Sequence, residues 1–134
     1  MNYLFKISKP GIFLICSLIC LTACKKEPDP LALSTAVVTD ITYSSATSGG
    51  NITSDGGLEI TARGVCWSQL QNPTTADSKT EDGSGSGAYT STITGLTPNT
   101  TYYVRAYATN SDGTAYGAEL PFSTGLLEDI EGNT

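Results

Sequence analysis

One cysteine near the N-terminus stands out as a residue that could do chemistry. Cys24 ends the almost wholly apolar run from Gly11 to Ala23, and two lysines follow it. A thiolate is a nucleophile, so this position is a candidate for covalent modification. Lys6 and Lys9 precede the run, which is too short for the roughly 20 residues that span a bilayer. This order predicts a secretory signal peptide, the alternative being a short transmembrane anchor.

The residues before the cysteine add a specific pattern. Leu21, Thr22, Ala23 and Cys24 resemble a bacterial lipobox. In that family a diacylglycerol is attached to the cysteine sulfur, the chain is cut before the cysteine, and the new amine is acylated. The resemblance implies a lipoprotein signal peptide at residues 1–23 and a lipid anchor in the bacterial cell envelope, at the periplasmic or surface face of the outer membrane. One acyl chain gives only marginal membrane binding, so two or three chains on one residue would make the attachment lasting.

The segment after the cysteine is predicted to be a lipidated tether, residues 24–34. It is polar and carries Pro28 and Pro30, which favour an extended chain. Ten residues at roughly 3.3 Å each would reach about 30 Å. The tether would hold a folded domain, residues 35–124, away from the lipid headgroups.

Composition excludes several kinds of chemistry. The chain has no histidine, which excludes His-based catalytic pairs and His zinc ligands. Its net charge of −6 disfavours nucleic acid as a partner. Cys16 and Cys20 leave with the signal peptide and Cys24 carries lipid, so Cys66 is the single thiol of the mature chain and no internal disulfide forms. A lone cysteine among strand residues is usually a packing residue.

The acidic residues between the strands are predicted to be solvated loop charges. Asp77, Glu81 and Asp82 lie in a Gly/Ser-rich stretch, whereas paired catalytic carboxylates need a rigid mount. The run 82–87 (DGSGSG) has oxygen ligands but lacks EF-hand spacing and a late glutamate. No metal, no cofactor and no enzyme activity are predicted.

From residue 35 the pattern is that of short strands separated by turns. Runs rich in β-branched and aromatic residues alternate with Gly, Asn, Asp and Pro, which is typical of an all-β protein. Seven strands at regular spacing predict an immunoglobulin-like β-sandwich. The expected strands are residues 36–42, 48–54, 58–68, 78–82, 89–94, 101–110 and 114–124.

Alternation assigns the faces of the strand at residues 101–110. Tyr102, Val104, Ala106 and Ala108 share the face expected in the core, where the alanines leave room for a large side chain such as Trp67.

The strand at residues 58–68 does not fit simple alternation. Glu59, Thr61 and Arg63 would share a solvent face, and strict alternation would place Trp67 there as well. A bulge at Gly64 is expected to turn Trp67 inward, because burying a tryptophan is favourable.

A second resemblance concerns the fold. Leu96, Pro98, Thr100, Tyr102, Val104 and Ala106 form the spacing L-x-P-x-T-x-Y-x-V-x-A. This spacing resembles the corner before strand F of fibronectin type III domains, where a tyrosine hydroxyl bonds back to the loop. The resemblance implies a fibronectin type III-like sandwich, with Leu96, Pro98 and Tyr102 forming a structural tyrosine corner. The same stretch is similar to domains of Bacteroidetes-type surface lipoproteins.

One surface is a candidate for ligand binding. Tyr103 and Tyr107 share the outward face of their strand, and Tyr116 is expected beside them. Tyrosines in a row could stack on sugar rings, but they are also ordinary cross-strand partners. If these tyrosines are covered, the glycan interpretation fails at this face.

The sequence therefore favours a non-catalytic, lipid-anchored envelope protein that acts as a spacer or as a protein or glycan interaction module. The alternatives are a carbohydrate-binding module of a glycan-uptake system and an accessory fragment of a multidomain hydrolase. The tail, residues 125–134, either opens a truncated further domain or is a frayed terminus.

Overall fold

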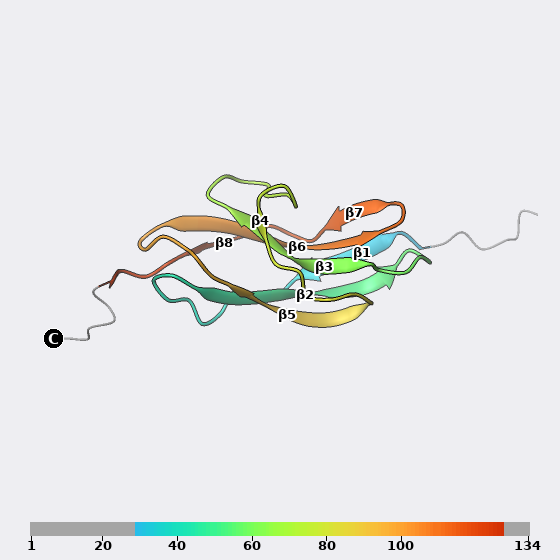
Figure 1. The fold of residues 1–134 in the computed structure, drawn as a ribbon, viewed down its shortest axis with the longest axis horizontal. Coiled ribbons are helices and arrows are strands. Elements are labelled where there is room, and N and C mark those ends of the chain that lie inside the picture. Colours follow the sequence, from blue (N-terminus) through green and yellow to red (C-terminus); the bar gives the residue numbers. More distant parts are fainter. Residues whose placement is uncertain (1–28, 128–134) are drawn as a thin grey trace, which may run out of the picture.

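The computed structural model describes residues 29–127, which form two antiparallel sheets packed face to face (Figure 1). The predicted all-β sandwich is confirmed. None of the described residues forms a helix long and apolar enough to cross a membrane. The strands are β1 (Leu31–Thr35), β2 (Ala46–Asp55), β3 (Ala62–Ser68), β4 (Ser78–Lys79), β5 (Gly87–Ile93), β6 (Thr101–Asn110), β7 (Gly113–Tyr116) and β8 (Leu120–Ser123).

The first sheet, in the order β1-β2-β5, is called sheet A, and the second, β4-β3-β6-β7, is called sheet B. β8 also pairs with β6, so β7 and β8 follow one another along the same side of that strand. The core lies between the sheets and follows the period-2 pattern expected of strands with one buried face. Its buried hydrophobic residues include Ala46, Ile52, Ile60, Val65, Ile93, Leu96, Tyr102, Val104, Ala108 and Phe122.

The bounds of β6 match the predicted strand at both ends, and its four expected core residues are buried. The last predicted strand is interrupted instead, because residues 117–119 leave the ladder between β7 and β8. The Thr35 hydroxyl occupies the gap: it accepts the Ala106 N–H at 3.0 Å and donates to the Ala118 carbonyl at 2.6 Å. A Cβ at Gly117 would approach that hydroxyl to 2.6 Å, so this position suits only glycine.

The prediction of the first strand was wrong. The strand is Leu31–Thr35 rather than residues 36–42, and it lies largely inside the segment that was expected to be tether. Leu31 and Leu33 pack against the core cluster of Ile52, whereas Val37 is 73% exposed. Residues 36–42 contribute one isolated bridge, from Thr39 to Thr47. The β-branched residues at 36–42 favoured a strand there, but composition does not show which of two neighbouring segments packs against apolar residues of the core.

The predicted bulge at Gly64 was also wrong. β3 pairs with β6 in unbroken register from Ala62 to Ser68. Strict alternation therefore holds, and Arg63 shares the inward face with Val65 and Trp67. Trp67 packs against the core as expected.

Arg63 can face inward because it lies at the side of the sandwich where residues 82–86 cross from β4 to β5. Its guanidinium lies 5.0 Å from the centroid of the Tyr89 ring and donates to the carbonyls of Asp82 and Gly85 at 3.1 and 2.9 Å. Carbonyl oxygens and an aromatic face thus replace water around the charge.

Tyr89, beside Arg63, also links the two sheets. From β5 its hydroxyl lies 2.8 Å from the Gly64 carbonyl and 3.2 Å from the Tyr107 carbonyl, so that it can donate to either. A Cβ at Gly50 would lie 2.6 Å from that hydroxyl, so a glycine in β2 leaves the space that the tyrosine fills. The glycines of β2 weaken the strand signal in the sequence but serve this close contact.

Replacing Ile93 by alanine should lower the free energy of unfolding by about 2–5 kcal/mol, because it leaves a cavity at a fully buried site. Leu70 is 76% exposed, and Leu70→Ala should change stability by no more than about 0.5 kcal/mol. Urea unfolding of a chain beginning at Lys25 measures both. Equal losses for the two variants would contradict this placement of the core.

Candidate functional site

The predicted tyrosine face is largely covered. Tyr107 is 2% exposed, and its hydroxyl donates to the Thr80 carbonyl at 2.6 Å. The Lys79 ammonium lies 6.0 Å from the centroid of its ring. Tyr107 thus holds the residues after β4 against β3 and β6, and it offers no open ring to a ligand.

The neighbouring tyrosine is covered by the connection between β3 and β4. Arg105 lies over the Tyr116 ring at 4.1 Å and donates to the Pro73 carbonyl at 2.6 Å. The Tyr116 hydroxyl accepts the Thr75 N–H at 3.1 Å. Tyr103, the third member of the predicted face, is half-buried. The segment 72–82, which includes the short strand β4, thus occupies the surface on which a sugar was expected to stack.

The acidic residues of the same region are committed to structural contacts. One Asp77 carboxylate oxygen accepts the Thr74 N–H at 2.8 Å, and Glu81 pairs with Lys79. Asp82 accepts hydrogen bonds from Thr80 and Ser91 at 2.7 and 2.5 Å. Within residues 29–127, no group of three or more acidic or cysteine side chains is placed to hold a metal ion.

The structure places the predicted corner residues together. The Tyr102 hydroxyl accepts the Thr97 N–H at 2.9 Å, five residues upstream, which is the contact of a tyrosine corner. Leu96 is buried below it, and the Tyr102 ring stacks on Phe122 at a centroid distance of 5.8 Å. The Pro98 carbonyl accepts the Thr100 hydroxyl at 2.9 Å, which fixes the loop that the tyrosine closes. This cluster positions β6 and carries no chemistry of its own.

The remaining thiol is inaccessible. Cys66 is fully buried, and its Sγ lies 3.6 Å from the Arg105 carbonyl. Burial raises the pKa of the Cys66 thiol to about 11. A protonated, buried thiol is a poor nucleophile, so Cys66 is a packing residue. The lipobox residues 21–24 lie outside the described residues.

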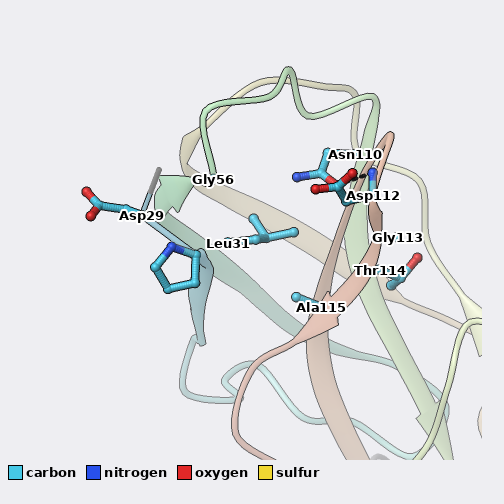
Figure 2. Close-up of a pocket in the computed structure, with 9 residues that line it drawn as sticks. Asp29, Leu31, Gly56, Asn110, Asp112, Gly113, Thr114 and Ala115 are labelled. Atoms are coloured by element: carbon cyan, nitrogen blue, oxygen red, sulfur yellow. Dashed lines mark hydrogen bonds between the residues drawn. The ribbon is translucent and has the colours of Figure 1, made fainter. Parts of the chain in front are cut away.

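Sequence reasoning missed a hollow of about 370 Å³ at the end of the molecule where the described chain begins. The side chain of Leu31 points into it, while the Asp29 carboxylate points away (Figure 2). Asn110 is 7% exposed and holds the wall: its amide donates to the Asp55 carbonyl at 3.1 Å, and its oxygen accepts the Asp112 N–H at 2.8 Å. These polar groups already serve the turns around the hollow. No sequence pattern predicted this hollow, because it forms where the β2–β3 turn, the β6–β7 turn and the start of β1 meet.

A second hollow, of about 340 Å³, also escaped prediction. It includes Trp67 and the corner residue Tyr102, and Asp77 is the single carboxylate among the residues that line it. Its polar wall combines the end of β3 with the start of β4 and the turn at Gly95.

Comparison with known proteins identifies the architecture. The short form of the sensor domain of the anti-sigma factor RsgI4 from Pseudobacteroides cellulosolvens is 21% identical, with a TM-score of 0.55; the match covers 74% of this chain and 98% of that one. The sixth fibronectin type III domain of human fibronectin type III domain containing protein 3 is 22% identical, with a TM-score of 0.51, and the match covers 76% and 90%. A structure described as a myokine is 13% identical, with a TM-score of 0.54 and coverage of 72% and 99%.

The fold is fibronectin type III-like. No protein-family model matches the chain, and no curated protein matches it in sequence. Identities this low establish the fold alone, because one fold hosts many unrelated functions.

Replacing Tyr107 by phenylalanine should lower the free energy of unfolding by about 1–3 kcal/mol, because the Thr80 carbonyl loses its donor. Tyr103→Phe is the matched control, on the same face of β6 four residues earlier, and should stay within about 0.5 kcal/mol. Urea unfolding at neutral pH measures the difference. If both variants are neutral, Tyr107 does not hold the segment after β4.

Stability should fall at alkaline pH. Burial raises the pKa of Cys66 from 9.0 to about 11 and raises the pKa values of Tyr89 and Tyr107 above 10.0. The folded chain therefore keeps these protons at pH values where the unfolded chain has lost them, and stability decreases as pH rises from 9.0 towards about 11.

Urea unfolding at a series of pH values across this range measures the decline. The Cys66→Ala variant should begin to lose stability about one pH unit later than the parent chain, where the tyrosines rather than the thiol begin to titrate. Stability that is flat or increasing above pH 9 in the parent chain would contradict the burial of these groups.

Proposed function

We propose that this protein is a lipid-anchored, non-catalytic module of the bacterial cell envelope, which acts as a spacer between the membrane and whatever binds or follows its far end. The proposed anchor is the lipidated Cys24. What supports the anchor is the sequence pattern at Leu21–Cys24 behind a positive segment and an apolar run.

The positions of the two chain ends support the proposed spacer role. β1 begins at one end of the elongated sandwich, and the described chain leaves β8 at the opposite end (Figure 1). The first end, which also holds the β2–β3 and β6–β7 turns, is called the anchor pole; the end at Leu127 is called the distal pole. An anchor at Cys24 would thus place the full length of the domain between the membrane and the distal pole.

Charge at the anchor pole favours separation from the lipid. Asp29 and Asp112 line the hollow at this pole, and Asp55 ends β2 beside it. Anionic headgroups repel such a cluster, whereas Lys25 and Lys26, next to the lipid, are attracted to them. A tether with basic residues at the lipid and an acidic domain beyond it would stay extended.

A glycan-binding role has less support than the spacer role. The tyrosine face on which it rested has one ring buried and another stacked under Arg105. The fragment-of-a-hydrolase interpretation depended on the tail, of which residues 128–134 lie outside the described residues.

Labelling with a radioactive fatty acid tests the anchor. Cells that express the wild-type chain should incorporate label into this protein, and the Cys24→Ala variant should incorporate none. Cys66→Ala is the control, and it should label like the wild type because its thiol is buried in the folded domain. An unlabelled wild-type chain, or a labelled Cys24→Ala variant, would refute the anchor. Release of the domain by protease from intact cells would assign it to the outer surface.

A further inference from the structure

Three of the four sheet edges are protected against pairing with another strand. β1 has a register shift between Ala32 and Leu33, and Thr35 ties its end to the segment before β8. β4 has two residues, one of them Lys79. The β7–β8 edge is interrupted and carries Pro121. Irregularity, short length, charge and proline are the usual means by which proteins protect an exposed edge.

The fourth edge, β5, has none of these protections. Its seven residues pair with β2 in unbroken register, from Ala46 with Ile93 to Ile52 with Gly87. The strand contains no charge and no proline, and no charged residue occurs anywhere in residues 83–104. β5 runs along one rim of the molecule (Figure 1).

The hydrogen bonds of β2 show which groups of β5 are free. Thr47 exchanges two backbone bonds with Thr39, and Gly49 accepts the Ala36 N–H, so these residues of β2 face away from β5. The alternate residues, Ser48 and Gly50, therefore bond to Ser91 and Tyr89.

It follows that the N–H and C=O groups of the three intervening residues of β5, Ala88, Thr90 and Thr92, point outward. Among residues 29–127 no backbone or side-chain partner is found for them. Their side chains are exposed.

We propose that β5 is a self-pairing edge, whose partner is β5 of a second copy of this chain. The two strands would run antiparallel about a two-fold axis at Thr90, with Ala88 opposite Thr92 of the other copy. Each outward pair would exchange two bonds, about six in all. The pairing would join the two copies of sheet A into one six-stranded sheet.

The sequence of the edge suits a copy of itself. Two-fold pairing sets Thr90 opposite Thr90 of the other copy, so a charge at that position would directly face a like charge. β5 has none, and the central contact would be threonine on threonine, which is a favourable cross-strand pair. The acidic groups that give the chain its net charge of −6 lie outside this stretch.

The strength of pairing depends on confinement, and this part of the inference rests on the proposed anchor. One strand edge is small beside the roughly 1,600 Å² of a stable interface, so pairing in dilute solution should be weak. Lipid anchoring confines copies to one plane and raises their effective concentration. The two-fold axis is perpendicular to sheet A, so the anchor poles of the two copies point in opposite directions and the pair would lie with this sheet parallel to the membrane, whereas an unpaired copy would stand upright as a spacer. The tether left before β1, residues 25–30, reaches about 20 Å at roughly 3.3 Å per residue, and one such tether can then connect each end of the pair to the lipid.

Disulfide trapping in the full-length, membrane-anchored chain tests the pairing. Thr90→Cys places a thiol on the axis, where the two Cα atoms would be about 5.5 Å apart, within disulfide range. Asn51→Cys is the matched control: it is exposed on the same face of sheet A but on the central strand β2. Under a mild oxidant, Thr90→Cys should give at least about tenfold more disulfide-linked dimer than Asn51→Cys. Equal amounts, or no dimer from Thr90→Cys, would overturn the proposal.

A second measurement needs no cysteine and no anchor. Amide hydrogen exchange of the Lys25–Thr134 chain should slow for Ala88, Thr90 and Thr92 as protein concentration rises to the millimolar range. Thr90→Pro removes one outward N–H without breaking the ladder to β2, and it should abolish the concentration dependence. Exchange that is independent of concentration in the parent chain would also overturn the pairing.

The Cys24→Ala,Thr90→Cys double variant separates the two proposals. Loss of trapping in this variant alone would show that the anchor supplies the confinement. Unchanged trapping would refute that role of the anchor and leave the pairing in place.

Discussion

The backbone of β6 is the element on which the two sheets depend. It lies in sheet B, yet two of its polar groups contact side chains of sheet A: the Ala106 N–H bonds to Thr35, and the Tyr107 carbonyl lies within bonding distance of the Tyr89 hydroxyl. A buried amide or carbonyl without a partner costs about 1–3 kcal/mol, which is a large part of the stability of a small domain. These contacts therefore fix the separation and register of the sheets more specifically than apolar contacts, which are non-directional.

Glycines make these contacts geometrically available. Gly50 leaves the space for the Tyr89 hydroxyl, and Gly117 leaves the space for Thr35. Gly64 lets Thr80 approach β3, since a Cβ there would lie 2.3 Å from the Thr80 carbonyl. Each of these glycines weakens its own strand, and each is placed where an inter-strand or inter-sheet contact needs the room.

The sequence predicted the fold class and the bounds of β6 because ten residues of β6 alternate cleanly between the two faces. It failed for β1, because Leu31 and Leu33 are ordinary residues whose importance depends on Ile52, which is distant in the chain. It failed for Arg63, because periodicity gives a residue's face but does not show that residues 82–86 and the Tyr89 ring supply partners for a charge on the inner face. The tyrosine face was misjudged for a related reason: Tyr107 does point outward, but an irregular connection then folds over it.

The placement of the chain ends at opposite poles also determines how the domain would bear a mechanical load. A pull between the membrane and the distal pole would act along β1 and β8, nearly parallel to the strands. The hydrogen bonds of antiparallel strands lie perpendicular to that direction, so those between β1 and β2 would be sheared together rather than broken one after another. The bonds of Thr35 to β6 and Ala118 would carry part of that load directly between the two sheets, so this single hydroxyl would help the sandwich resist extension.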